Sequence, residues 1–249
     1  DKDQLRDRMG QWTKDPRSGP PSLPRSSEGG GTGAGGGGGV PRKRKPRRHA
    51  GRKPLTDRQF QERADYVDRT MSSALKEHST DRVHAPGGVW TPERDRIHRQ
   101  IADDLYARAA DVPNEGKAVM AGGLGGAGKS TVLKKHAGID PSQYLTVNPD
   151  DVKEEMVKRG LVPEVPGAED LSPMERSALV HEESSRIAQL VAQKAYADQK
   201  NMIWDITMSS QPSIDSRVRA MREAGYSDIN GVFVDIPTEV SVARALSRY

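Results

Sequence analysis

The sequence predicts a three-layer α/β fold with a parallel β-sheet, preceded by two helices and a disordered, basic, glycine-rich tail. From residue 117 onward, apolar segments of strand length alternate with amphipathic segments of helical length. The segments that join them are short, and such alternation is typical of a parallel sheet with helices on both faces. The first 54 residues show no such pattern.

Residues 1–54 differ in composition from the remainder of the chain. They contain 14 Lys and Arg against five Asp and Glu, whereas residues 55–249 contain 25 against 30. Nine of the eleven residues at 29–39 are glycine, so this stretch has nothing to bury and is predicted to be a flexible linker. Residues 41–54 carry eight Lys or Arg and no acid. They could make weak contact with nucleic acid or serve only as a spacer.

Residues 55–112 are predicted to form two helices. In the first, apolar residues recur every three or four positions, at Phe60, Ala64, Val67 and Met71. In the second, the same spacing occurs at Ile97, Ile101, Leu105 and Ala109. Thr91 is expected to cap the second helix, with Pro92 at its first position.

Residues 116–249 are predicted to form the sheet and the helices around it. The predicted strands are residues 117–124, 144–147, 201–206 and 229–236. The predicted helices are residues 130–135, 151–159, 174–200, 213–224 and 238–249. The last helical pattern is unfinished at Tyr249 and the chain begins with Asp1, so we expect a fragment of a longer protein.

The composition excludes several classes of protein. Cysteine is absent, which excludes disulfides, thiolate metal sites and a cysteine nucleophile. No apolar run approaches the ~20 residues needed to cross a bilayer, and no signal-peptide pattern opens the chain. We therefore expect a cytoplasmic protein with no membrane partner.

The strongest motif is Gly-Leu-Gly-Gly-Ala-Gly-Lys-Ser at residues 123–130, which fits G-x-x-x-x-G-K-S in full. It lies between an apolar strand and a helix, as a phosphate-binding loop requires. Lys129 is long enough to reach the β- and γ-phosphates of ATP, and the Ser130 hydroxyl can bind Mg²⁺. The predicted nucleotide-binding residues are Gly123, Gly125, Gly126, Ala127, Gly128, Lys129, Ser130 and Thr131.

A dinucleotide-binding loop is the alternative. Gly123, Gly125 and Gly128 also fit G-x-G-x-x-G, and Asp150 lies 22 residues beyond Gly128, where such folds place a ribose-binding acid. The lysine and serine that follow the last glycine favour a nucleoside triphosphate, because a dinucleotide pyrophosphate needs neither.

Candidate chemical groups follow the second and third predicted strands. Asp150 follows the second strand, where a carboxylate could take the proton of an acceptor hydroxyl. Because an aspartate there could also cap the next helix, we assign Asp150 as the base and Asp151 as the cap. Asp205 ends the third strand and resembles an acid that holds the water shell of a metal, while Thr207 could donate to a phosphate or a substrate oxygen.

Glu183 falls on the apolar stripe of the predicted helix 174–200. A carboxylate on a buried face is costly unless it is paired or used. Glu183 is therefore expected either to pair with an arginine or to bind substrate.

Together these motifs resemble the zeta toxin family of bacterial UDP-N-acetylglucosamine kinases. The matching segments are residues 91–98, 122–130, 148–151, 181–185, 205–207 and 236–248. The resemblance covers residues 55–249 and implies a P-loop kinase fold with ATP and Mg²⁺ as cofactors. It implies phosphorylation of the amino-sugar 3′-hydroxyl of UDP-N-acetylglucosamine. Family members are often held by an antitoxin, so the resemblance also implies a possible antitoxin partner.

The resemblance also implies roles for individual residues. Asp150 is similar to the catalytic base, and Lys129 and Ser130 are similar to ligands of the triphosphate and the metal. Arg248 resembles an arginine that stabilises the transferring phosphate. The residues expected at the substrate are Glu183, Asp205 and Thr207. The family usually has glycine where Ile206 stands here.

Two other functions stay open. The chain could phosphorylate another hydroxyl, on a small molecule or at a nucleic-acid 5′ end, and the basic residues 42–53 slightly favour the latter. It could also be an ATP-binding module whose tail binds nucleic acid.

Overall fold

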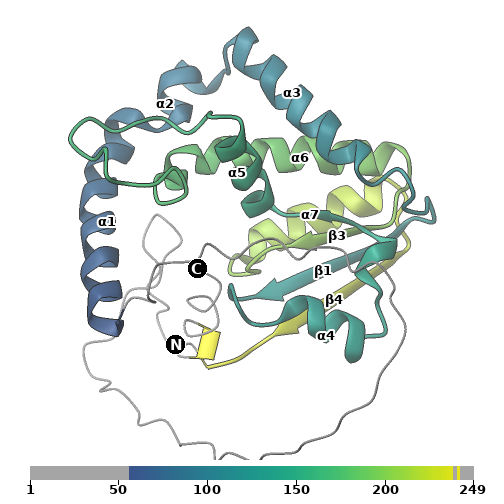
Figure 1. Cartoon of the computed structure of the whole chain (residues 1–249). Helices are drawn as coiled ribbons and strands as arrows, with labels where there is room; N and C mark the ends of the chain where they lie inside the picture. Colours follow the sequence, from purple (N-terminus) through teal and green to yellow (C-terminus); the bar gives the residue numbers. More distant parts are fainter. Residues whose placement is uncertain (1–55, 238–239, 242–249) are drawn as a thin grey trace, which may run out of the picture. The chain divides into compact units, whose positions relative to one another are not determined.

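The structure is a computed structural model that describes residues 56–237 and 240–241 (Figure 1). The predicted tail at 1–54 lies outside the described residues, as does most of the predicted last helix, including Arg248. The chain divides into two compact units, residues 1–62 and 63–249. The first unit contributes only the opening residues of one helix to the described part of the chain.

Four parallel strands form one sheet, as the alternating pattern predicted. The strands are β1 Lys117–Gly123, β2 Leu145–Val147, β3 Met202–Asp205 and β4 Asp228–Val234. Their order is β2-β3-β1-β4, and Val119 of β1 lies opposite Ile203 of β3 and Asn230 of β4. β1 is central and is buried after its first residue, as expected of a strand covered on both faces.

Seven α-helices and three short 3₁₀ helices lie within the described residues. The α-helices are α1 Asp57–His78, α2 Thr80–His84, α3 Pro92–Ala107, α4 Lys129–Lys135, α5 Pro149–Lys158, α6 His181–Ala197 and α7 Gln211–Glu223. The 3₁₀ helices are η1 Pro86–Gly88, η2 Pro141–Gln143 and η3 Ser177–Val180. The predicted cap of α3 is confirmed, because Thr91 accepts a hydrogen bond from the Arg94 backbone N–H.

The predicted helix 174–200 was too long at both ends. α6 begins only at His181, since the preceding residues Ser177–Val180 form the 3₁₀ helix η3. Further upstream, Glu175 accepts hydrogen bonds from Arg63 and from the backbone N–H of Ser172. α6 ends at Ala197, and Gln199 takes a left-handed conformation with φ +54°, which interrupts the helix.

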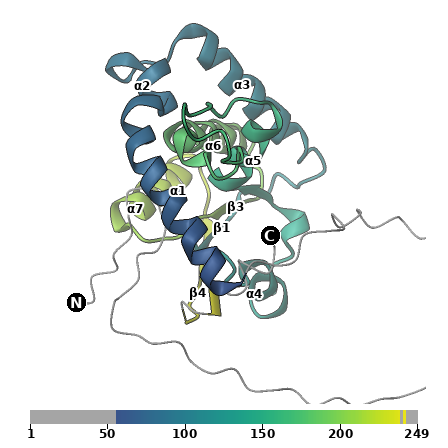
Figure 2. The same cartoon turned by 60° about the vertical axis from the view of Figure 1, so that its left-hand side comes forward.

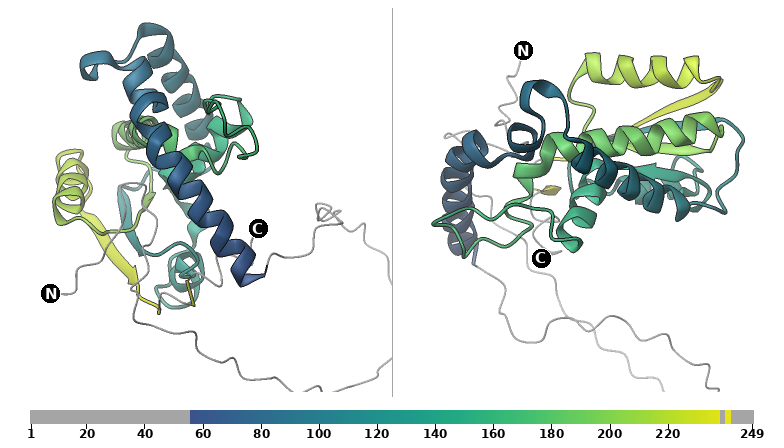
Figure 3. Two further views of the ribbon diagram at one scale, coloured as in Figure 1. Left: turned by 90° about the vertical axis from the view of Figure 1, so that its left-hand side faces the viewer. Right: turned by 90° about the horizontal axis from the view of Figure 1, so that it is seen from above.

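Two cores cover the two faces of the sheet, which confirms the three-layer architecture. The larger lies under α3, α5, α6 and α7, and its fully buried members include Met120, Ile187 and Met202. The smaller contains Val119, Ala121, Leu133 of α4 and Ile203. Figures 1 and 2 show α5 and α6 on one side of the sheet and α4 on the other. α3 and α6 run side by side, as Figure 3 shows from above.

α1 is a long polar helix that holds the irregular segment between α5 and α6. Arg63 pairs with Glu175 at 2.7 Å and with Asp170 at 2.6 Å. The Tyr66 hydroxyl donates to Asp170 at 2.8 Å.

None of the helices in the described ranges is both long enough and apolar enough to cross a membrane.

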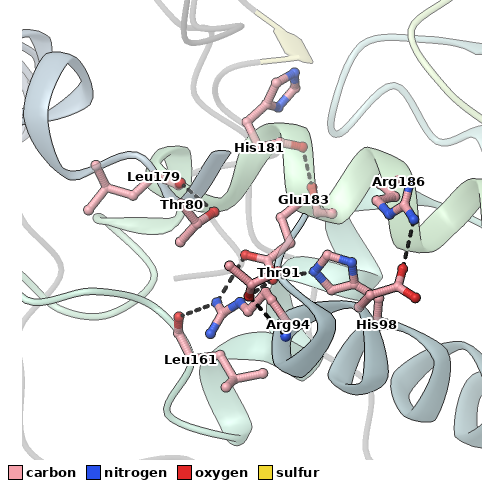
Figure 4. Close-up of polar contacts among 11 residues, drawn as sticks. Thr80, Thr91, Arg94, His98, Leu161, Leu179, His181, Glu183 and Arg186 are labelled. Carbon is pink, nitrogen blue, oxygen red and sulfur yellow. Dashed lines mark hydrogen bonds and ion pairs between the residues drawn. The ribbon is translucent and has the colours of Figure 1, made fainter. Parts of the chain in front are cut away.

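A buried ion cluster of Glu183, Arg94 and His98 joins α3 to α6 (Figure 4). Glu183 is fully buried, and its Oε1 lies 2.5 Å from Arg94 Nε and 2.6 Å from His98 Nε2, while Oε2 lies 3.0 Å from Arg94 Nη2. Burial alone would raise the pKa of Glu183, but hydrogen bonds from His98 and Arg94 lower it to about 2. The carboxylate is therefore ionised in the folded protein and bound on both oxygens.

Replacing this carboxylate should destabilise the fold. We expect Glu183→Gln to lower the free energy of unfolding by about 3–5 kcal/mol, because it leaves the buried Arg94 without its counter-charge. Urea denaturation followed by circular dichroism measures the change. The exposed Glu223→Gln on α7 is the control and should change stability by less than about 0.5 kcal/mol. Equal stability of the two variants would contradict a stabilising ion cluster.

The Glu183 carboxylate should also make the stability of the fold depend on pH in the acidic range. Its pKa is depressed from 4.5 to about 2 on folding, so its contribution is complete above pH 4.5 and is lost as the pH falls toward 2. Urea midpoints measured across this window should fall more steeply for the wild type than for Glu183→Gln. Parallel curves would show that Glu183 is not the group responsible.

Candidate functional site

The glycine-rich loop joins β1 to α4 at the carboxyl end of the central strand. Gly123, Gly126 and Gly128 have φ values of +129°, +82° and +88°, which residues with side chains rarely adopt. A Cβ on Gly123 would lie 2.4 Å from the carbonyl oxygen of Val234. The loop therefore requires glycine both for its backbone conformation and for its close approach to β4.

Lys129 folds back over the loop toward the end of β3. Its Nζ donates to the carbonyl oxygens of Gly123 at 3.0 Å and Leu124 at 3.4 Å, and it lies 3.2 Å from Asp205 Oδ1. Both side chains are largely buried, with 16% and 23% of their surfaces exposed. Burial raises the pKa of Asp205 above its ordinary value of 3.8, and the Lys129 charge opposes this rise. The loop thus carries the positive charge of Lys129, and the carboxylate of Asp205 lies beside it.

Ser130 and Thr131, in the first turn of α4, are exposed. Gly125 is also exposed, and nothing lies within 4 Å of the position its Cβ would take. The buried Ser241 donates from its hydroxyl to the Gly125 carbonyl at 2.5 Å, a contact that no local sequence pattern predicts. The outer side of the loop is therefore open to a ligand, while the Gly125 carbonyl is bound to Ser241.

Asn148 caps α5, so the prediction that Asp151 is the cap was wrong. The Asn148 Oδ1 accepts from the Asp150 backbone N–H at 2.8 Å, and its Nδ2 lies 3.5 Å from Asp205 Oδ2. The order Asn-Pro, with proline at the first helical position, is the signal that could have identified this cap. The side chain of Asp150 is left 79% exposed and pairs with Lys153 Nζ at 3.0 Å.

The segment after β3 packs against the end of β1. Thr207 Oγ1 lies 3.0 Å from the Ser209 hydroxyl. Met208 has a φ of +53°, and its sulfur would lie 2.3 Å from a Cβ on Gly122. A side chain at Gly122 would therefore require the side chains of Met208 and Phe233 to move.

The remaining predicted site residues lie apart from this group. Glu183 is bound to Arg94 and His98 in the buried cluster, which is one of the two outcomes that the sequence left open. Arg248 lies outside the described residues.

The parallel sheet brings the loop, Asp205 and Asp150 to one edge, because the carboxyl ends of β1, β3 and β2 coincide. Among the described residues, no group of three or more His, Asp and Glu could hold a metal by itself. Mg²⁺ commonly binds through one or two protein oxygens together with substrate phosphates. The exposed Ser130 hydroxyl and the Asp205 carboxylate fit that mode of binding.

Several solved structures are similar to this chain, and three of them are described here. The AvrRxo1-ORF1:AvrRxo1-ORF2 complexes with sulphate ions and with ATP show 21% and 23% identity and TM-scores of 0.49 and 0.48. They match 66% and 65% of this chain and 52% and 51% of theirs, so the chain spans about half their length. The PezAT toxin-antitoxin system of Streptococcus pneumoniae shows 14% identity, a TM-score of 0.47 and 64% coverage of both chains. Among curated proteins, none matches.

A family model gives the assignment. The model described as Zeta toxin matches residues 103–249, which is more than half of the chain. The matched region contains the glycine-rich loop with Lys129, the aspartates at the ends of β2 and β3, and Glu183. This chain therefore belongs to the zeta toxin family.

Proposed function

We propose that this chain is an ATP-dependent phosphotransferase that phosphorylates the amino-sugar 3′-hydroxyl of UDP-N-acetylglucosamine. The observation that carries the proposal is the convergence of three groups at one sheet edge: the loop with Lys129, the largely buried Asp205 at 3.2 Å from it, and the exposed Asp150. Membership of the zeta toxin family supports the same reaction class. The catalytic unit is residues 55–249, with residues 1–54 as a linker.

The loop and α4 would bind the triphosphate of ATP. In this role Lys129 leaves the carbonyls of Gly123 and Leu124 and neutralises the β- and γ-phosphates. Ser130 would bind Mg²⁺ directly, and Asp205 would hold its water shell. Bound Mg²⁺ would neutralise charge that develops on the transferring phosphoryl group.

Asp150 would act as the base. Its carboxylate is exposed at the start of α5, so an acceptor hydroxyl can approach it, and the ion pair with Lys153 orients it. Arg248 is proposed to stabilise the transferring phosphate, and Thr207 to contact the substrate. The substrate contact of Glu183 stays a prediction. The buried ion pair of Glu183 with Arg94 supports a second role, in which Glu183 positions α3 against α6.

An antitoxin that covers the ATP site is a further part of the proposal. It rests on the resemblance to the zeta toxin family. Co-purification of the chain with a candidate antitoxin, followed by loss of ATP binding in the complex, would test it.

Two alternative functions make different predictions about substrate. A kinase of another hydroxyl would label a small molecule or a 5′-hydroxyl oligonucleotide in a screen with radioactive ATP. A nucleotide-dependent binding module would transfer no phosphate, and its affinity for DNA would be lost with residues 1–54. The net positive charge of those residues is the observation that favours nucleic acid in either case.

Removing the proposed base should abolish transfer without affecting nucleotide binding. We expect Asp150→Asn to lower kcat by about 10²- to 10⁴-fold, because no carboxylate is left to accept the proton. Phosphorylated UDP-N-acetylglucosamine is measured by mass spectrometry and ATP affinity by calorimetry. The neighbouring Asp151→Asn is the control and should keep most of the activity. Full activity in Asp150→Asn would exclude this residue as the base.

Removing the loop lysine should instead weaken nucleotide binding. We expect Lys129→Met to raise the Kd for ATP by about tenfold or more and to abolish transfer, because the triphosphate loses its nearest cation. Lys134→Met, at the other end of α4, is exposed and should bind ATP as the wild type does. An unchanged Kd in Lys129→Met would mean that ATP binds elsewhere.

A further inference from the structure

Asn148 follows β2 directly and lies beside Asp205, which ends β3. Val147 of β2 pairs with Trp204 of β3, so the next residue of each strand lies at the same level of the sheet edge. The half-buried amide of Asn148 uses both of its ends there. Its Oδ1 accepts from the Asp150 backbone N–H at 2.8 Å, and its Nδ2 donates to Asp205 Oδ2 at 3.5 Å. One side chain therefore contacts both the helix of the proposed base and the carboxylate at the end of the neighbouring strand.

The oxygen of the Asn148 amide sets the start of α5. Pro149, at the first helical position, has no N–H, so the Asp150 N–H is the first backbone donor of the helix that needs a partner. Asn148 supplies that partner and fixes Asp150 in the first turn. Serine, threonine and aspartate cap helices about as well as asparagine does. Capping alone therefore does not require an amide at this position.

The nitrogen of the amide holds the second oxygen of the Asp205 carboxylate. Lys129 Nζ lies 3.2 Å from Oδ1 of this carboxylate, so Asn148 and Lys129 contact different oxygens. If Lys129 moves to the phosphates of ATP, the contact with Asn148 stays in place. In the part of the chain that the structure describes, Asn148 is then the one side chain left that donates to Asp205.

An amide suits both contacts because it carries an acceptor and a donor. A carboxylate at position 148 would cap α5 but would place a second negative charge against Asp205. A serine hydroxyl lies one bond closer to the backbone, so it cannot cap α5 and also extend to Asp205. Turning the amide over would place its oxygen against the Asp205 carboxylate and its N–H groups against the Asp150 N–H. The two contacts therefore fix a single orientation of the amide.

We propose that Asn148 is a positioning residue, which holds the Asp205 carboxylate and the start of α5 in a fixed relation so that Asp205 and the base Asp150 face the same phosphoryl group. The inference rests on the proposed function and adds a residue to it. A hydrogen-bonded path thus crosses the carboxyl ends of three neighbouring strands. It runs through Lys129 on the loop after β1, Asp205 on β3, Asn148 after β2 and Asp150 on α5.

Variants that keep the cap but lose the donor separate the two contacts of Asn148. Asn148→Ser should lower kcat by about tenfold and Asn148→Asp by about a hundredfold, which is the range typical of residues that orient the groups around a metal. The larger loss follows from repulsion between the new carboxylate and Asp205. In Asn148→Ser the KM for UDP-N-acetylglucosamine and the Kd for ATP should change by less than about twofold, because the loop is intact. The urea midpoint of this variant should match that of the wild type, because serine keeps the cap.

The matched control is Asn230→Ser on β4. Asn230 is an exposed asparagine whose Nδ2 donates to Asp228 at 2.7 Å, away from the strand ends that carry the site. Its replacement should leave kcat unchanged. A wild-type kcat in Asn148→Ser, or an equal loss in Asn230→Ser, would overturn the proposal. A lower urea midpoint in Asn148→Ser would also overturn it, because the lost activity would then follow from a weakened helix start.

A measurement on the free protein separates this inference from the proposed function. The side-chain amide of Asn148 gives a pair of signals in a ¹H–¹⁵N NMR spectrum, which are assigned by their absence in Asn148→Ser. We expect Asp205→Ala to shift these signals and to leave those of Asn230 in place, because Asn148 donates to Asp205 and Asn230 donates to Asp228. A shift confined to Asn148 supports the inference even if no acceptor is phosphorylated. Unshifted Asn148 signals would refute it even if the kinase activity is confirmed.

Discussion

The ion pair between Lys129 and Asp205 joins the two strand ends on which the site depends. It spans 3.2 Å between residues 76 positions apart, and it forms only because β1 and β3 are parallel neighbours. Asn148, at the end of β2, reaches the same carboxylate while capping the helix that carries Asp150. One acidic side chain thus connects the phosphate loop with the proposed base. The order of the strands in the sheet is what makes this arrangement possible.

A second charged group, buried between α3 and α6, joins these two helices through Glu183, Arg94 and His98. Burying Arg94 and Glu183 costs desolvation that apolar residues would avoid. In return Glu183 fixes the ring of His98, which meets the ring of Trp90 edge to face.

Local patterns allowed the sheet and the loop to be predicted from the sequence. The alternation of strands and helices, the G-x-x-x-x-G-K-S motif and the cap at Thr91 all depend on residues close in the chain. What could not be predicted depends on distant contacts. Arg94, the partner of Glu183, lies 89 residues away, and Glu175, which was predicted to lie in the long helix, instead pairs with Arg63 of α1, 112 residues away. Asn148 was missed for another reason: its cap signal was present, but the aspartates that follow it are equally good caps.

The most direct test of the account is a crystal structure of this chain with Mg²⁺ and a non-hydrolysable analogue of ATP. The account predicts that the β- and γ-phosphates lie in the loop, that Lys129 Nζ has left the Gly123 carbonyl to contact them, and that Mg²⁺ lies between Ser130 and Asp205. A nucleotide bound elsewhere, with the amine still on the Gly123 carbonyl and the loop empty, would contradict it.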